Sequence, residues 1–424
     1  MRYLLVIILC LPFCANAQNN PGYLADLDAL YGHLKKTPSF KDQVKGPALK
    51  DYHELYERLK KDTVSDPGSY HYFYQLAQLL FPIRDNHLGF YQSMSENNLK
   101  DRPSYEKYIA SPEFKNFPKA SLDIDSLNIA LSAKPRDSVE GIYWLDTLFS
   151  VGVFKSAGAE YTAVVLSSKV TVWQHPNWEK GQVAFHLYEF LPGHFKAIYA
   201  DPVTKRWILF PNEKFRNASL INSHFYGYFY ERAYSKMTGQ QDFSRLPRDR
   251  PDYELKMISP GIQYLQLKHF SADEKAMQQS EAFYDSIKNL LTEPNLVVDL
   301  RNNQGGAMKV SAKFLKLLKR YAKTGRIFVL VNNGTYSQGE IFTLQLRQSA
   351  NAFILGQTTN GTLMYGSNYG RTTVLPSNAF RLYLTDMDGD SRLLPYEVFG
   401  VQPDIELDNS QDWIAQTIAF IRKK

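Results

Sequence analysis

The sequence predicts a multi-domain protein that combines an α/β core with a helical part and an antiparallel β part. Between residues 295 and 350, two short apolar strands alternate with two segments of helical spacing, which is typical of a parallel sheet. From about Gly141 to Asn222, apolar residues alternate with a period of two between Gly, Pro, Asn and Asp turns. This pattern predicts an antiparallel module, a small barrel or a sandwich. Residues 22–80 carry leucine and tyrosine at helical spacing.

These patterns divide the 424 residues into four parts. Residues 1–17 combine one basic residue, an apolar run and an Ala-x-Ala end, which predicts a cleaved secretory leader too short to span a bilayer. We expect a helical region over residues 18–110, the antiparallel module over 111–244 and the α/β domain over 253–424. The chain is therefore predicted to be secreted or periplasmic, with no integral membrane segment once the leader is removed.

Composition excludes several classes of function. Cys10 and Cys14 both lie in the predicted leader, so the rest of the chain has no cysteine for a disulfide, a thiol nucleophile or a zinc site. A formal net charge of +6 is a small excess on a chain of this length, which argues against nucleic acid as the main partner. The oligomeric state is not indicated by any feature of the sequence.

The α/β core places a serine where a strand passes into a helix. The apolar strand Ile327–Val331 is followed by N-N-G-T-Y-S-Q-G-E, in which Ser337 precedes a helix that includes Ile341. Unpaired N–H groups and the positive end of a helix dipole can stabilise an oxyanion at such a position. The Gly305-Gly306 turn ends the neighbouring strand and can bring a further amide there. The residues alone leave two roles open for Ser337, a nucleophile or an ordinary helix N-cap.

The two motifs V-V-D-L-R-N-N-Q-G-G and V-N-N-G-T-Y-S-Q-G-E together resemble the catalytic domain of the C-terminal-processing (tail-specific) serine peptidases and their tricorn-core-like relatives. The resemblance covers about Gly261 to Asp408. It implies a crotonase/ClpP-like α/β catalytic core, with the N-terminal helical region as a cap. It also implies that Ser337 is the nucleophile and that backbone amides of Gly305, Gly306 and Gln338 form the oxyanion hole.

The general base is the second part of the predicted site. His87 lies in the loop Asp85-Asn86-His87, where a structural role is the commoner one when the residues alone are considered. The resemblance to the tricorn-like branch, which places its base in a D-x-H-type turn of the helical region, implies that His87 is the base, with Asn86 in support. An imidazole with a pKa of about 6.5 accepts a serine proton at neutral pH. We therefore expect activity to rise with pH through a pKa of about 6 to 7.

A lysine base is missing from the stretch where the serine–lysine members of the family carry one. The resemblance implies a lysine in a turn that corresponds here to Thr359-Asn360-Gly361-Thr362, and Thr362 occupies the lysine position. Since a hydroxyl is not a base near neutral pH, Thr362 is predicted to support the site only. No PDZ-like carboxylate-binding loop is recognisable, so the sequence does not predict recognition of substrate C-termini.

A glutamate near the C-terminus completes the predicted site. The G-V-Q-P-D-I motif, with Glu397 three residues before its glycine, resembles the tricorn-like branch, which implies a place for Glu397 in the catalytic relay. Residues 386–390, D-M-D-G-D, resemble a calcium loop with Glu397 at its twelfth position. Glycine stands at the fourth position instead of the sixth, and strand patterns flank the segment, so we interpret it as a turn. We predict neither a metal nor an organic cofactor.

These observations predict a secreted or periplasmic serine endopeptidase of the Ser/His branch, without a PDZ domain. Ser337 would attack a peptide carbonyl and form an acyl-enzyme, with His87 as general base. The alternative is a catalytically silent relative that binds peptides, glycans or apolar ligands in its cleft and β module. Labelling by an active-site serine reagent would separate the two.

Overall fold

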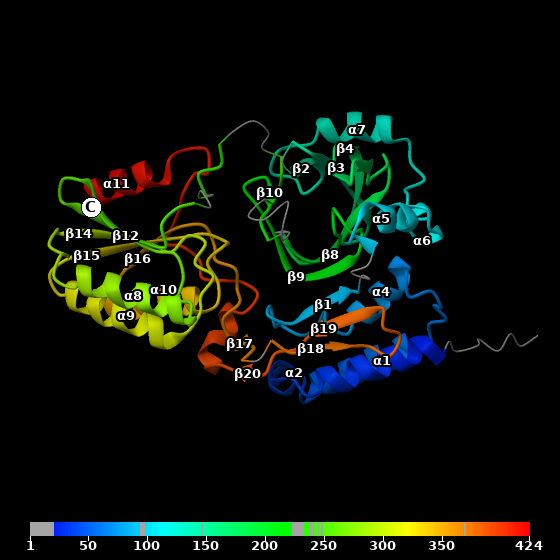
Figure 1. Ribbon diagram of the computed structural model, residues 1–424, viewed down its shortest axis with the longest axis horizontal. Coiled ribbons are helices and arrows are strands. Elements are labelled where there is room, and N and C mark those ends of the chain that lie inside the picture. The colour runs from blue at the N-terminus through cyan, green and yellow to red at the C-terminus, as the bar shows by residue number, and fades with distance from the viewer. Residues whose placement is uncertain are drawn as a thin grey trace, which may run out of the picture.

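The computed structural model describes residues 21–93, 98–145, 147–222, 233–236, 241–244, 246, 249–368 and 370–424. The predicted leader, with Cys10 and Cys14, lies outside these residues. They form an antiparallel barrel, an α/β sheet covered by helices, and a layer of N-terminal helices (Figure 1). None of the helices in the described ranges is long and apolar enough to cross a membrane.

Within the described residues, eleven antiparallel strands form the larger sheet. They are β1 (Gly89–Gln92), β2 (Gly141–Leu145), β3 (Phe149–Ala157), β4 (Glu160–Ser168), β7 (Val183–Leu191), β8 (His194–Ala200), β9 (Trp207–Arg216), β10 (Ser219–Leu220), β11 (Tyr234–Ser235), β18 (Thr372–Val374) and β19 (Phe380–Tyr383). Their order is β10-β11-β2-β3-β4-β7-β8-β9-β1-β19-β18, and β10 pairs with β9 as well as β11. The strands from β10 to β9 thus close into a barrel, which confirms the predicted antiparallel module.

The second sheet is mostly parallel. Its strands, in spatial order, are β12 (Tyr253–Ser259), β13 (Ile262–Leu267), β14 (Asn295–Asp299), β15 (Arg326–Val331), β16 (Phe353–Gly356) and β21 (Ile405–Glu406). β12 pairs antiparallel with β13, and the other neighbours are parallel. The apolar runs that predicted two buried strands coincide with β14 and β15, whose residues are buried except for Arg326.

Helices cover both faces of the parallel sheet, which explains why the central strands β14 and β15 are almost continuously apolar. α8 (Glu274–Ile287), α9 (Met308–Tyr321) and α10 (Gln338–Ala350) lie on one face, and α11 (Trp413–Lys423) lies on the other (Figure 1). Val298 packs in the cluster of Phe314 from α9, whereas its neighbour Val297 packs in the cluster of Trp413 from α11. The mixed α/β architecture agrees with the prediction, and its crotonase/ClpP-like assignment stays a prediction.

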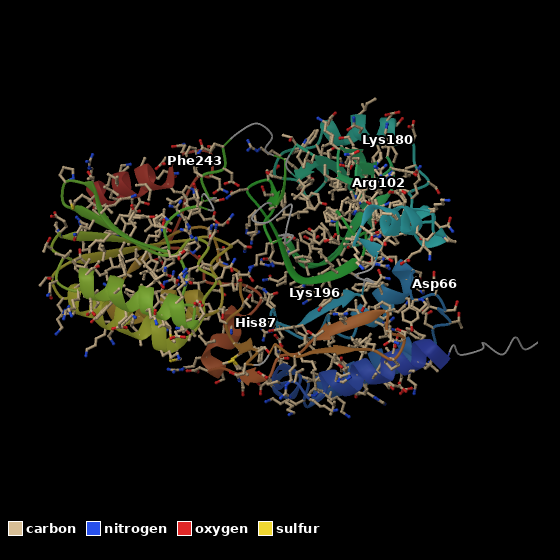
Figure 2. All side chains as sticks on the ribbon, viewed as in Figure 1. Asp66, His87, Arg102, Lys180, Lys196 and Phe243 are labelled. Atoms are coloured by element: carbon tan, nitrogen blue, oxygen red, sulfur yellow. The ribbon has the colours of Figure 1, made fainter. Side chains whose placement is uncertain are left out.

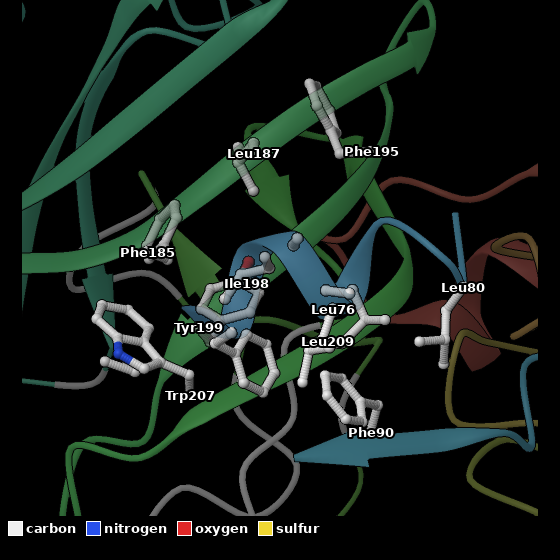
Figure 3. Packing of buried hydrophobic residues seen from close by; sticks show 14 of the residues in the cluster. Leu76, Leu80, Phe90, Phe185, Leu187, Phe195, Ile198, Tyr199, Trp207 and Leu209 are labelled. Carbon is white, nitrogen blue, oxygen red and sulfur yellow. The ribbon is translucent and has the colours of Figure 1, made fainter. Parts of the chain in front are cut away.

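The remaining helices pack mainly against the barrel and against β1, β19 and β18, which continue the same sheet beyond β9. They are α1 (Pro21–Leu34), α2 (Pro38–Gln43), α3 (Pro47–Leu59), α4 (Tyr70–Ala77), α5 (Arg102–Ile109), α6 (Pro112–Lys115) and α7 (Ile124–Ser132). Tyr74 of α4 stacks on Tyr188 of β7 with ring centroids 4.9 Å apart. Figure 3 shows Leu76 of α4 beside Leu209 of β9, with Leu80 in the same buried cluster. This packing fixes the end of α4, from which the His87 loop begins.

Strands from distant parts of the chain meet at β1. It follows the His87 loop directly and lies between β9 of the barrel and β19 from the C-terminal region. Residues predicted to belong to three separate parts therefore share one sheet. Hydrophobic periodicity shows that a segment is a strand but does not show its pairing partner, so the boundaries predicted at 110, 244 and 253 stay predictions.

Candidate active site

Ser337 lies at the turn between β15 and α10, and its backbone is strained. Its φ of 56° and ψ of −126° lie in a region that residues with a Cβ rarely adopt. Such a conformation costs on the order of 1–3 kcal/mol and persists where neighbouring groups fix it. Here the Ser337 N–H donates to the Thr362 carbonyl at 2.9 Å and to Glu340 Oε2 at 3.2 Å. A strained serine between a strand and a helix can present its hydroxyl to a substrate.

The Gly305-Gly306 turn follows β14 and touches the Ser337 turn. Both glycines have positive φ, 79° and 128°. A Cβ on Gly305 would lie 2.9 Å from Ser337 Cβ and 2.7 Å from the Gln338 nitrogen, so a glycine is required beside the serine. A Cβ on Gly306 would meet the Phe270 carbonyl oxygen at 2.0 Å. Because β14 and β15 are parallel neighbours, their carboxyl ends bring the two turns together.

Two of the three amides predicted for the oxyanion hole are open. Within the described ranges, the N–H groups of Gly306 and Gln338 donate no hydrogen bond to the protein. The Gln338 amide is open because it belongs to the first turn of α10, where no intrahelical acceptor exists. The Gly305 N–H instead donates to Asn303 Oδ1 at 2.9 Å. Gly305 thus allows its turn to lie close to the Ser337 turn, while the amides of Gly306 and Gln338 are available to an acceptor.

The loop between α4 and β1 carries His87 to the junction of the two sheets (Figure 2). The buried Asp85 carboxylate fixes this loop: its Oδ1 accepts the N–H groups of His87 and Leu88, each at 3.2 Å. Its Oδ2 accepts the Thr385 hydroxyl at 2.6 Å. Burial raises the pKa of Asp85, and these hydrogen bonds oppose that rise. Asp85 therefore sets the backbone from which the His87 ring projects.

The His87 ring is held in its neutral form. Its Nδ1 is buried and has no hydrogen-bond partner among the described residues. Burial lowers the pKa of His87 to about 4, and an interaction with the Tyr365 backbone opposes the change. The pKa of 6 to 7 expected from the sequence is therefore too high, because the sequence does not show what covers the ring. No hydrogen bond joins the ring to the Ser337 hydroxyl in the described part of the chain, although such bonds are often long in unliganded enzymes.

Asn86, Glu397 and Thr362 form one hydrogen-bonded group. The Asn86 side chain donates to Thr362 Oγ1 at 2.9 Å and to Asn360 Oδ1 at 2.8 Å. Glu397 Oε1 accepts the Asn86 N–H at 2.7 Å, and its Oε2 accepts the N–H groups of Leu363 and Met364, both at 2.8 Å. Burial and then the charge of Asp85 raise the pKa of Glu397 to about 8. Glu397 thus connects the His87 loop to residues 362–364, whose Thr362 carbonyl accepts the Ser337 N–H. These hydrogen bonds do not involve the side chain of His87 or of Ser337.

The calcium-like segment does not gather its carboxylates around one centre. Asp390 pairs with Arg392 through Nε at 2.9 Å and 3.0 Å, and Asp386 Oδ1 accepts the Asn368 N–H at 2.7 Å. Both oxygens of Glu397 accept N–H groups from elsewhere, as described above. No group of three or more His, Cys, Asp or Glu in the described ranges could hold a metal ion.

Glu340 is a functional candidate that lies inside the sequence motif but was not assigned a role there. Its side chain is fully buried in the first turn of α10. Besides the Ser337 N–H, its carboxylate accepts the N–H of Gly361 at 2.7 Å, the N–H of Thr362 at 2.8 Å and the Thr359 hydroxyl. A helix N-terminus favours an acidic side chain, and its place three residues after Ser337 is the signal that could have identified it.

Lys214 of β9 approaches the turn of residues 359–362 from the barrel. Its fully buried Nζ donates to the carbonyls of Asn360 at 2.8 Å and Thr359 at 3.2 Å. Glu340 therefore takes the N–H groups of this turn and Lys214 takes its carbonyls, which holds the turn between two opposite charges. Burial lowers the pKa of Lys214 to about 7 and raises that of Glu340 to about 7, and their attraction opposes both shifts. The polar run Asn212-Glu213-Lys214, which interrupts the alternation of β9, is the signal in the sequence.

A cavity of about 730 Å³ lies between the two sheets beside this group. Its lining includes Asn86, His87 and Thr362 from the predicted site, and Gly334 and Tyr336 from the turn that precedes Ser337. Ser337 itself is not part of the lining. β9 adds apolar wall residues on the opposite side, namely Ile208, Leu209, Phe210 and Pro211. This volume is ordinary for a ligand site, and it is large enough for several residues of a peptide.

The family comparison agrees with this geometry. The sequence model of peptidase family S41 matches residues 261–323 and 311–407, which include both turns described above. The match covers the α/β part of the chain and supports a peptidase, a class of hydrolases. The match of residues 261–407 to the model of peptidase family S41 confirms the resemblance to the C-terminal-processing peptidases.

Several solved structures are similar to the chain at low identity. A lipoprotein from Streptococcus agalactiae is 19% identical over 40% of this chain and 69% of its own, with a TM-score of 0.29. The photosystem II D1 C-terminal processing protease is 14% identical over 92% and 94%, with a TM-score of 0.34. Mature CPAF is 10% identical over 95% and 96%, with a TM-score of 0.43. No curated protein matches the chain significantly.

Proposed function

We propose that this protein is a serine endopeptidase that cleaves peptide bonds through an acyl-enzyme on Ser337. The observation that carries the proposal is the strained Ser337 turn beside the open amides of Gly306 and Gln338. Strain at one partly exposed polar residue, fixed by hydrogen bonds to Glu340 and Thr362, is typical of a functional site. The leader-like residues 1–17 further support secretion or a periplasmic location.

The proposed reaction uses the side chains and amides of this chain. Ser337 Oγ attacks the peptide carbonyl carbon, and His87 accepts the hydroxyl proton. The N–H groups of Gly306 and Gln338 hold the oxyanion of the tetrahedral intermediate. The protonated His87 then gives the proton to the leaving amine, and a water molecule, deprotonated by His87, hydrolyses the acyl-enzyme. At neutral pH the lowered pKa of His87 keeps the ring unprotonated, and the same shift makes the imidazole a weaker base than a free histidine.

The other residues of the group are proposed to position these reacting atoms. Glu397 and Asn86 connect the His87 loop to the 360–364 loop, and Thr362 connects that loop to the Ser337 backbone. A shift of any of these connections would change the distance between Ser337 and His87. Since a misplacement of about 1 Å can cost about a hundredfold in rate, they are expected to matter for kcat more than for KM.

Labelling with a fluorophosphonate reagent tests the proposal. One equivalent of reagent should attach to Ser337, as located by peptide mass spectrometry, and Ser337→Ala should not react. Ser349, an exposed serine at the far end of the same helix α10, provides the control: Ser349→Ala should be labelled like the unmodified protein. A protein that is folded but unlabelled would instead support a catalytically silent relative.

A further inference from the structure

A second pocket lies on the outer face of the barrel and shares no lining residue with the cavity at His87. Its volume is about 520 Å³, which is within the range of small-molecule sites. The wall is largely aromatic and apolar, with contributions from Tyr74, Phe81, Tyr188, Phe190, Leu191 and Phe399. Phe190 and Leu191 are 39% and 46% exposed, so apolar surface at this pocket faces solvent.

A buried cation without an anionic partner lines this pocket. Lys196 of β8 is 5% exposed and stands opposite Tyr188 of β7, on the face of the barrel that α4 covers (Figure 2). Its Nζ lies 5.1 Å from the ring centroid of Phe190. Within the described ranges, this ammonium group forms no hydrogen bond and no ion pair. Nζ is not among the buried side-chain atoms that lack a partner, so the ammonium opens onto the pocket, where it is available to an anionic ligand.

The neighbouring charges do not neutralise Lys196. Arg84 lines the same pocket, and its positive charge adds to burial in lowering the pKa of Lys196 to about 8. Glu160 and Glu189 also lie in the wall, but neither forms an ion pair with Lys196 in the described part of the chain. Glu189 Oε1 instead accepts the Gly193 N–H at 2.9 Å. The pocket wall therefore holds two cationic and two acidic side chains next to aromatic rings, and Lys196 is paired with neither carboxylate.

The pocket adjoins both segments that carry the proposed active-site residues. Arg84 immediately precedes Asp85, and Val398 and Phe399 immediately follow Glu397. Val398 has a φ of 76°, which is a genuine outlier for a β-branched residue, and its N–H donates to the Gly361 carbonyl at 2.8 Å. Backbone strain of this kind gathers at ligand sites and switch regions.

We infer that this pocket binds a small molecule in which a carboxylate is joined to an aromatic or aliphatic group. The carboxylate would pair with Lys196 and Arg84, and the apolar part would lie among Phe81, Tyr188 and Phe190. Both halves of the ligand are needed, because the cations supply charge pairing and the rings supply apolar burial. The inference does not depend on the proposed peptidase activity.

Isothermal titration with a matched pair of probes tests the inference. 3-Phenylpropionate should bind at least tenfold more tightly than 3-phenylpropionamide, which has the same shape without the charge. Lys196→Met should abolish this difference, since methionine keeps the length of the side chain and removes the ammonium. Lys180→Met is the control, because Lys180 lies at a distant exposed site and should leave both affinities unchanged (Figure 2).

Two further variants keep the result decisive. Arg84→Gln should weaken 3-phenylpropionate several-fold, so a Lys196→Met protein that fails to fold would not end the test. Phe190→Ala should weaken the acid and the amide alike, because it removes apolar contact and no charge. Equal affinity for acid and amide in the unmodified protein, or an unchanged preference in Lys196→Met, would overturn the inference.

Discussion

Replacement of Gly305 by alanine is the most direct test of the geometry around Ser337. The added Cβ would lie 2.7 Å from the Gln338 nitrogen and 2.9 Å from Ser337 Cβ, where ordinary contact begins at 3.4 Å. The Ser337 turn must therefore move by about half an ångström or more, since backbone lies on both sides of the contact. This displaces the proposed nucleophile and one proposed oxyanion amide together.

The expected loss of kcat can be estimated from the displacement of Ser337 and of the Gln338 amide. A misplacement of about 1 Å can cost about a hundredfold in rate, and removal of one oxyanion donor costs about a hundred- to a thousandfold. We therefore expect Gly305→Ala to lower kcat on a quenched-fluorescent peptide by at least a hundredfold. The free energy of unfolding should fall by about 1–3 kcal/mol, because alanine at a φ of 79° is strained as well as crowded.

Gly46 offers a matched control for the backbone strain that alanine adds at a positive φ. It also has a positive φ, 59°, but a Cβ there would meet no atom within 4 Å. Gly46→Ala should therefore share the cost of the left-handed conformation and keep full kcat. The reasoning is refuted if Gly305→Ala retains kcat within threefold of the unmodified enzyme, or if Gly46→Ala loses as much activity as Gly305→Ala.

The remaining predictions concern the charges of the site. His87→Ala should lower kcat about a thousandfold or more, measured with the same peptide. Because His87 must be neutral to accept a proton, kcat/KM should be lost as the pH falls through about 4, and an acid limb at 6 to 7 would contradict the burial effect. Lys214→Met removes the buried cation that attracts Glu340 and should lower the free energy of urea unfolding by about 1–3 kcal/mol above pH 7, with partial recovery in Lys214→Met/Glu340→Gln. EDTA or added calcium should leave the Tm unchanged, since Glu397 accepts N–H groups with both oxygens.

The Lys214 prediction has a pH dependence that distinguishes it from a simple packing defect. Without the cation, the pKa of Glu340 should rise further above its unfolded value. A carboxyl group with a raised pKa destabilises the fold when it is ionised, so the loss should be greatest above pH 7 and should shrink as the pH falls. A loss of stability that is independent of pH would indicate that Lys214 contributes packing and no electrostatic support.

The sequence by itself determined those features that depend on neighbouring residues. The helical spacing of Met308 to Tyr321 coincides with α9, and the turn that places Ser337 between β15 and α10 follows from an apolar strand, a Gly-containing turn and an amphipathic helix. Side-chain periodicity and turn chemistry act within a few residues, so the printed sequence contains them. The two family motifs are continuous stretches of this kind.

The tertiary structure decided which distant segments meet. β1 after His87 pairs with β19, and Lys214 of β9 reaches the carbonyls of Thr359 and Asn360. Burial of the His87 ring and of Glu340 follows from these contacts, and with it the direction of each pKa shift. No local pattern encodes them, because the free energy of a buried charge depends on every group packed around it, and those groups come from separate parts of the chain.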